Sequence, residues 1–128
     1  MPWSNQVTGT APNIWLRALG WYGMALVDVL DYFPKDHPKQ KVLVGYLNEF
    51  ADGVTKYQDT SGLWYQVPNL QTRKGNYLEA SGSAMLVYAI AKGVNNGYLQ
   101  PNLKKVASKG FNGLISKLIK VDPNGEIH

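Results

Sequence analysis

The sequence predicts an all-α fold built from helical hairpins. Four stretches carry apolar residues at helical spacing, and they alternate in character: the first and third have no polar face, whereas the second and fourth are amphipathic. The turn signals that follow the two amphipathic stretches also match, because Asp59–Gly62 and Asp122–Gly125 are offset by 63 residues. Two copies of one hairpin of about 60 residues are therefore expected.

Length and composition exclude several classes of protein. A chain of 128 residues with 45% hydrophobic residues is long enough for one domain with a core, and its net charge of +4 is too dispersed to indicate nucleic-acid binding. The chain has no cysteine and two histidines, His37 and His128, which argues against a metal centre and a catalytic triad. No apolar run reaches membrane-spanning length and no secretory signal is visible, so no membrane partner and a cytoplasmic location are expected.

The first helix is expected over residues 13–33, ending at Pro34. Residues 19–30 are apolar or small at nearly every position, which predicts burial on all sides. Arg17 and Trp21 lie one turn apart on the same face near its beginning. An arginine fork beside an indole suits a planar anion such as a sugar carboxylate. The alternative is that Arg17 bonds loop carbonyls and Trp21 fills the core.

The second helix is expected from Asp36 or His37 to about Tyr57. Its inward stripe comprises Leu43, Tyr46, Leu47, Phe50, Ala51 and Val54. The connection over residues 58–75 is long, and loops of this length in a compact domain are usually functional or mobile. Trp64 and Tyr65 on this loop either line a sugar groove or close over the helix ends.

The third helix is expected from Asn76 or Tyr77 to about Gly93. The segment Asn76–Glu79 has capping-box spacing, which favours Glu79 as a cap that returns to the Asn76 amide over a role in binding a sugar hydroxyl. The fourth helix opens at Pro101 and turns its lysines outward. Its inward stripe comprises Leu103, Val106, Ala107, Gly110, Phe111, Leu114, Ile115, Leu118 and Ile119.

Hairpins with a buried first helix and a half-exposed second helix suggest an arc of a double-layered helical ring. Two hairpins do not close such a ring, and an open array needs neighbours on its exposed ends. The chain is therefore expected to form one partial domain over residues 1–128 and to self-associate through its open edges.

Several motifs resemble glycoside hydrolase family 105, the unsaturated rhamnogalacturonyl and glucuronyl hydrolases, in order along the whole chain. They are residues 3–9, WLRALGWYGMALVDVL at 15–30, QD at 58–59, GLWYQV at 62–67, NYLEASGSAM at 76–85, AKGV at 91–94 and GYL at 97–99. The resemblance implies part of an (α/α)6 barrel whose active site lies at the N-terminal ends of the inner helices. It implies substrates that are unsaturated uronide oligosaccharides from pectin-type polysaccharides, hydrolysed by hydration of the C4–C5 double bond, with no metal or cofactor.

The resemblance also implies roles for individual residues. Arg17 falls on the family's carboxylate-binding arginine and Trp21 on its ring-stacking tryptophan. The family's catalytic aspartate lies upstream of the arginine motif, so no catalytic residue is assigned and the chain is expected to cover the middle third of the enzyme and to be inactive alone. The candidate substrate-binding residues are Arg17, Trp21, Trp64 and Glu79. The alternative function is a non-catalytic helical module that binds acidic sugar or protein.

Overall fold

A computed structural model describes residues 4–127, so Trp3 and His128 lie outside the described residues. This range holds four α-helices: α1 (Leu16–Tyr32), α2 (Gln40–Thr55), α3 (Ala80–Asn95) and α4 (Lys104–Leu118). Two short 3-10 turns, η1 (Pro68–Leu70) and η2 (Pro101–Leu103), complete the regular structure. The all-α prediction is confirmed. No helix in this part of the chain is both long and apolar enough to cross a membrane.

The helices begin later than the sequence predicts. α2 starts at Gln40 because the ring of His37 accepts the Lys39 amide at 3.1 Å and holds a turn in front of the helix. α3 starts at Ala80, four residues after Asn76, because the Asn76 side chain bonds the preceding loop. The end of α1 was predicted more closely, since Phe33, which precedes a proline, is extended.

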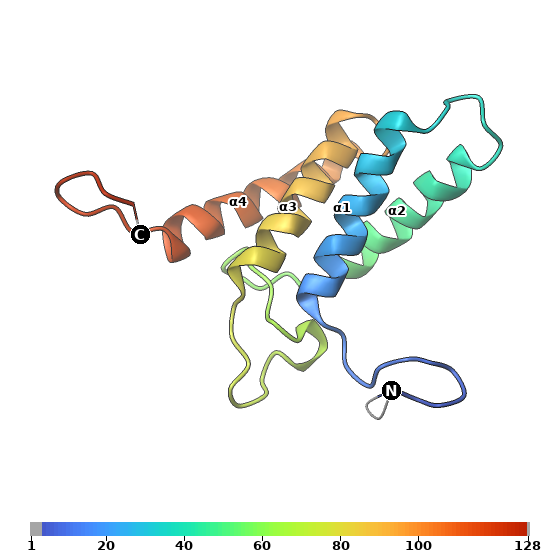
Figure 1. The fold of residues 1–128 in the computed structure, drawn as a ribbon. Helices are drawn as coiled ribbons and strands as arrows, with labels where there is room; N and C mark the ends of the chain where they lie inside the picture. Colours follow the sequence, from blue (N-terminus) through green and yellow to red (C-terminus); the bar gives the residue numbers. More distant parts are fainter. Residues whose placement is uncertain (1–3, 128) are drawn as a thin grey trace.

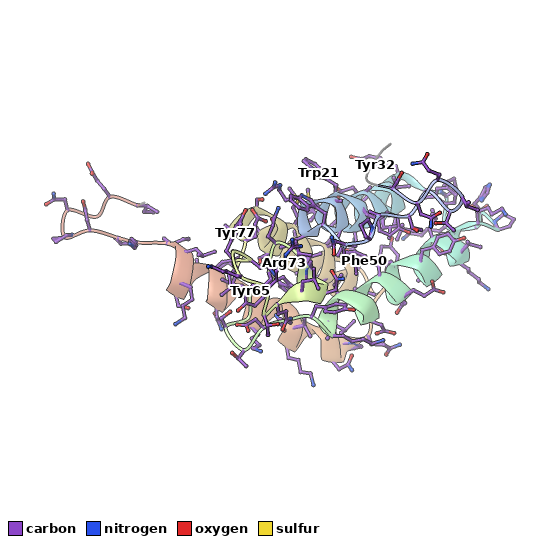
Figure 2. All side chains as sticks on the ribbon, turned by 90° about the horizontal axis from the view of Figure 1, so that it is seen from below. Trp21, Tyr32, Phe50, Tyr65, Arg73 and Tyr77 are labelled. Atoms are coloured by element: carbon purple, nitrogen blue, oxygen red, sulfur yellow. The ribbon has the colours of Figure 1, made fainter. Side chains whose placement is uncertain are left out.

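The four helices form two layers (Figures 1 and 2). α1 packs beside α3 in one layer, whereas α2 and α4 pack behind α1 and α3 respectively in the other. Glycines allow the close approach: a Cβ added at Gly20 would lie 2.7 Å from Met85 Cβ, and one added at Gly23 would lie 2.5 Å from the Phe50 ring. The prediction of inner and outer helices in consecutive hairpins is confirmed.

The internal repeat is visible in the two turns that follow α2 and α4. Gly62 donates its amide to the Asp59 carbonyl at 2.9 Å, and Gly125 donates to the Asp122 carbonyl at 3.0 Å. Both glycines have positive φ, at 92° and 84°, a conformation that favours glycine over other residues. Both aspartates also accept the amide two residues ahead through their side chains. The matching sequence signals therefore fold into matching turns.

The prediction that the first helix is buried on all sides is wrong for this chain. Within residues 19–30, Trp21 is 62% exposed, Tyr22 49% and Val29 48%, and Figure 2 shows Trp21 on the side of α1 that faces away from the outer layer. No helix of the described chain covers this side, because the main helix neighbours of α1 are α3 and α2. Residues predicted to face inward are also exposed on the outer helices and just after α4: Tyr46, Phe111, Ile115 and Ile119.

Candidate functional site

The N-terminal ends of α1 and α3 meet under the loop that precedes α3. The Leu16 amide donates to the Gln66 carbonyl at 3.0 Å, and the Glu79 amide donates to the Trp64 carbonyl at 2.9 Å. A Cβ added at Gly82 would lie only 2.5 Å from the Leu16 side chain, so the two helix starts are in close contact. One short extended segment thus fixes the beginnings of both inner helices relative to each other.

Glu79 is the N-cap of α3. One carboxylate oxygen accepts the Gly82 amide at 2.6 Å, and the other accepts the Ser81 amide at 3.2 Å and the Ser81 hydroxyl at 2.7 Å. The predicted capping role is confirmed, but the predicted return to the Asn76 amide is wrong, since that amide donates to the Arg73 carbonyl. Burial opposes the charged form of Glu79, but these hydrogen bonds and the nearby Arg17 outweigh it and lower the pKa of Glu79.

Arg17 reaches across from α1 to the same carboxylate. Its Nη1 lies 3.5 Å from Glu79 Oε1 and 3.5 Å from Gln66 Oε1, and its side chain is 42% exposed. Its guanidinium carbon lies 5.8 Å from the centre of the Trp15 ring. Both polar contacts are long and both use Nη1, so the guanidinium retains donors for an incoming anion. The acceptors are side-chain oxygens rather than the loop carbonyls of the alternative interpretation.

A hollow of about 390 Å³ opens beside Arg17 at this end of the molecule. Its lining combines three cations with aromatic and amide side chains, and comprises Trp15, Arg17, Gln66, Val67, Arg73, Lys74, Gly75, Asn76 and Tyr77. We call it the Arg17 hollow. Figure 2, which views the molecule from this end, shows Arg73 and Tyr77 on the loop that forms one wall. The sequence analysis did not identify Trp15, Arg73, Lys74 or Tyr77 as site residues. The adjacent cations Arg73 and Lys74, which precede Gly75 in a long loop, could have indicated an anion-binding site.

Of the four predicted binding residues, only Arg17 lines the hollow. Arg17 lines the hollow and contacts Glu79, whereas Trp21 lies one turn further along α1, on its exposed face and outside the lining. Trp64 is fully buried: its indole donates to the Val54 carbonyl at 2.8 Å, and a Cβ added at Gly110 would lie 3.2 Å from its ring. Trp64 therefore fills the core between the helices, and the prediction that it binds a sugar is wrong.

Comparison with known proteins places this arrangement in a family. A family model described as Glycosyl Hydrolase Family 88 matches residues 1–128. The chain belongs to glycosyl hydrolase family 88. A solved family 105 glycoside hydrolase from C. acetobutylicum ATCC 824 is 48% identical with a TM-score of 0.94, over 98% of this chain and 35% of that one. The predicted resemblance is confirmed, and the two hairpins correspond to a segment of the α/α barrel that these enzymes form.

Curated relatives of this family 88 chain include two hydrolases of unsaturated sugars and a protein whose name states no activity. Protein Atu3128 of Agrobacterium fabrum is 36% identical over 92% of this chain and 50% of its own length. An unsaturated 3S-rhamnoglycuronyl hydrolase of Formosa agariphila is 32% identical over 74% of this chain, and the unsaturated rhamnogalacturonyl hydrolase YesR of Bacillus subtilis is 29% identical over 69%. The chain spans about half the length of the first relative and a quarter of each hydrolase.

The family 88 chain holds its other inner-helix charges away from Arg17, in a network between α1 and α3. Lys92 Nζ lies 2.7 Å from Asp28 Oδ1 and 2.5 Å from Asp31 Oδ2, and the Tyr88 hydroxyl donates to Asp28 at 2.7 Å. The hydrogen bonds from Lys92 and then Tyr88 lower the pKa of Asp28, and those to Asp28 and Asp31 raise the pKa of Lys92. Asp28 is thus a hydrogen-bonded carboxylate that links the two inner helices. Within residues 4–127, no cluster of three acidic, histidine or cysteine side chains is placed to hold a metal.

Proposed function

We propose that this chain forms part of the substrate-binding wall of an enzyme that hydrolyses unsaturated uronyl oligosaccharides. The observation that carries the proposal is Arg17, which presents a half-exposed guanidinium to a hollow at the N-terminal ends of the inner helices. The names of the Formosa agariphila and Bacillus subtilis relatives support the class of substrate, because both are hydrolases of unsaturated uronyl sugars.

Arg17 is suited to bind the uronate carboxylate. A guanidinium presents parallel donors that match the two oxygens of a carboxylate. Glu79 and Gln66 hold Nη1 from one side, which orients the planar group while its remaining donors stay available. The negative charge of Glu79 is already stabilised by the amides at the start of α3, so it competes only weakly with a bound carboxylate.

Trp21 supplies the second element of the proposed wall. Its indole is 62% exposed one helical turn beyond Arg17, and an exposed indole face is a common stacking surface for a sugar ring. We assign it to the ring of the same uronide whose carboxylate Arg17 binds. Trp64 is excluded from this assignment because it is buried, and Glu79 acts through Arg17 and the helix cap.

The reaction that the family resemblance implies adds a proton to C4 and water to C5 of the unsaturated uronide, after which the hemiketal opens and releases the next sugar. The carboxylate bound to Arg17 is attached to C5, so Arg17 positions the carbon that water attacks. No carboxyl group lines the Arg17 hollow, and Glu79 is held anionic by its hydrogen bonds. We therefore propose that this chain binds the unsaturated uronide without turning it over.

The test is binding and turnover of an unsaturated rhamnogalacturonan disaccharide by the chain. Titration calorimetry is expected to show binding that weakens by about tenfold or more in Arg17→Ala, the loss typical of hydrogen bonds to a charged group. Lys56→Ala, at an exposed cation at the end of α2, is the matched control and is expected to bind normally. The ultraviolet absorbance of the double bond is expected to persist. Binding that is indifferent to Arg17 would contradict the binding assignment, and turnover abolished by Arg17→Ala would show a working enzyme.

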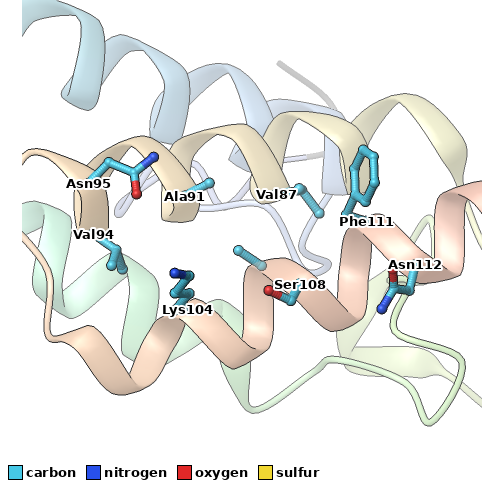
Figure 3. A pocket seen from close by; sticks show the side chains of 9 residues that line it. Val87, Ala91, Val94, Asn95, Lys104, Ser108, Phe111 and Asn112 are labelled. Carbon is cyan, nitrogen blue, oxygen red and sulfur yellow. The ribbon is translucent and has the colours of Figure 1, made fainter.

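We also propose that copies of the chain associate through the open side of α3 and α4. A groove of about 450 Å³ lies there, with Val87, Ala91 and Val94 on one wall and Phe111 on the other (Figure 3). In the first hairpin the side of α1 and α2 that faces α3 is covered by the second hairpin, where the Asn48 side chain donates to the Tyr98 carbonyl. The repeat therefore supports a second copy as the cover for the groove of the second hairpin.

Light scattering over a dilution series tests this association. The average mass is expected to rise with concentration and to fall towards one chain of 14.2 kDa in Phe111→Ser, since Phe111 is 56% exposed on the groove. Val7→Ser, at a 94% exposed position in the N-terminal loop, is expected to leave the mass unchanged. A constant monomer mass at all concentrations would exclude the proposed association.

A further inference from the structure

The Arg17 hollow extends onto a loop that carries two more cations. Arg73 and Lys74 line the hollow together with Arg17, and both are exposed. Neither forms an ion pair with any residue in the described part of the chain. Glu79, the carboxylate that pairs with Arg17, is bound by the start of α3. The hollow therefore presents more positive charge than a single uronate carboxylate requires.

The turn that carries these two cations is held in a fixed conformation by Asn76. The Asn76 side chain donates to the Val67 carbonyl at 3.0 Å and to the Leu70 carbonyl at 2.8 Å, and it accepts the Val67 amide at 3.1 Å. Its backbone amide donates to the Arg73 carbonyl at 3.0 Å. Because these bonds close the turn at both ends, the backbone of Arg73 and Lys74 is set in place before any ligand arrives.

The same loop is tied to the element that carries Arg17. The Gln66 amide donates to the Tyr77 carbonyl at 2.8 Å, and the Gln66 carbonyl accepts the first amide of α1. The spacing between the basic turn and Arg17 is therefore determined by backbone hydrogen bonds. Two half-exposed rings, Trp15 and Tyr77, line the space between these cations and offer apolar faces to sugar rings. The volume of about 390 Å³ lies within the range of sites that enclose a small ligand, about 300–1,000 Å³.

From this geometry we propose a second anionic subsite, in which Arg73 and Lys74 bind a carboxylate or sulfate group on the sugar next to the unsaturated uronide. The inference rests on the proposed function, because it takes Arg17 as the site of the first carboxylate. It narrows the substrate class to oligosaccharides with a charged neighbouring sugar. An arginine binds either anion through paired donors and a lysine adds a point charge, so the two anions share one recognition chemistry.

Three disaccharide probes distinguish these possibilities in titration calorimetry with the chain. The first is an unsaturated uronyl rhamnose, the second is the same disaccharide with a sulfate on rhamnose, and the third is an unsaturated uronyl galacturonate. The chain is expected to bind at least one doubly charged probe about tenfold or more tighter than the singly charged one, as one charge-assisted contact would give. The doubly charged probe with the larger gain in affinity identifies whether the second subsite prefers sulfate or carboxylate.

The Arg73→Gln/Lys74→Gln variant is expected to lose this preference and to bind the singly charged probe as before. The Lys35→Gln/Lys56→Gln variant removes two exposed cations elsewhere and is expected to keep the preference, which controls for net charge. Both positions in the test variant are exposed, and circular dichroism checks that the helices are intact. The preference is also expected to shrink at high salt, because exposed charges are screened.

The possible failures of the two proposals differ. Equal affinity for all three probes, or equal weakening of all three in the Arg73→Gln/Lys74→Gln variant, would overturn the second subsite and leave Arg17 in place. A singly charged probe whose affinity does not change in Arg17→Ala would overturn the proposed function. If none of the probes binds the chain, both proposals are wrong.

Discussion

Arg17 and Glu79 connect the beginnings of the two inner helices, with Arg17 Nη1 at 3.5 Å from Glu79 Oε1. The two residues are 62 positions apart in the sequence, and Glu79 is also the N-cap of α3. One carboxylate thus orders the helix start and orients the guanidinium of the proposed binding site. The stability of α3 and the geometry of Arg17 are therefore coupled.

Replacing Glu79 with alanine is expected to lower both stability and affinity. The loss of an N-cap costs about 0.5–2 kcal/mol in the free energy of unfolding. Urea denaturation is the measurement, with Glu49→Ala on the exposed face of α2 as the control. The affinity for an unsaturated uronide is expected to fall as well, because Arg17 loses its partner. A variant as stable as the parent would contradict the cap assignment.

The pH dependence of stability should report the same carboxylate. Hydrogen bonds and Arg17 hold the pKa of Glu79 below its ordinary value of 4.5, despite its burial. The folded state therefore binds the proton of Glu79 less readily than the unfolded state, so its contribution is present above about pH 4.5 and is lost as the pH falls through the folded pKa. Asp28 and Asp59 have lowered pKa values too and contribute in the same direction.

The variant Glu79→Gln isolates this contribution. Urea unfolding between about pH 6 and about pH 3 is expected to show a shallower decline in the variant than in the parent, because one of the linked groups no longer titrates. Parallel curves across this range would mean that Glu79 has the same pKa in the folded and unfolded chains.

Two glycine substitutions, one between the inner helices and one on an exposed face of the outer helix α2, are expected to change stability in opposite directions. Gly20→Ala places a methyl group 2.7 Å from Met85 Cβ, and the resulting overpacking is expected to cost about 1–3 kcal/mol. Gly45→Ala on α2 meets nothing within 4 Å, so helix propensity is expected to raise stability by about 0.5–1 kcal/mol. Thermal denaturation compares the two. A neutral Gly20→Ala would show that α1 and α3 are further apart than described.

The fold was largely predictable because its signal is periodic. The alternation of wholly apolar and amphipathic stretches identified all four described helices and their layers, and the repeated Asp-to-Gly turns identified the hairpin unit. The exposure of Trp21 and Phe111 was not predictable from the same pattern. An apolar helix face shows that it prefers a partner, but its pattern does not specify where that partner lies.

The candidate site was only partly predictable, because its loop follows no period. Arg17 was identified from its place near the start of a helix, whereas Arg73 and Lys74 reach the same hollow only through the hydrogen bonds of Asn76. Those bonds also explain the misplaced start of α3, since they hold Asn76 in the loop that precedes the helix. Trp64 was misassigned because its burial depends on long-range packing against α4, as at Gly110.

The two tryptophans with opposite environments give the final prediction. Trp64→Phe removes the indole donor to the Val54 carbonyl and leaves a void in the core, at a cost of about 2–4 kcal/mol. Trp21→Phe shortens a side chain that is largely exposed. It is expected to change the free energy of unfolding by less than about 0.5 kcal/mol. Urea denaturation measures both variants. Because Trp21 is assigned to stacking on the uronide, Trp21→Ala should weaken sugar binding while unfolding at nearly the parental urea concentration. If Trp21→Ala unfolded early and bound normally, the ring would belong to the packing of the chain instead of the sugar-binding wall.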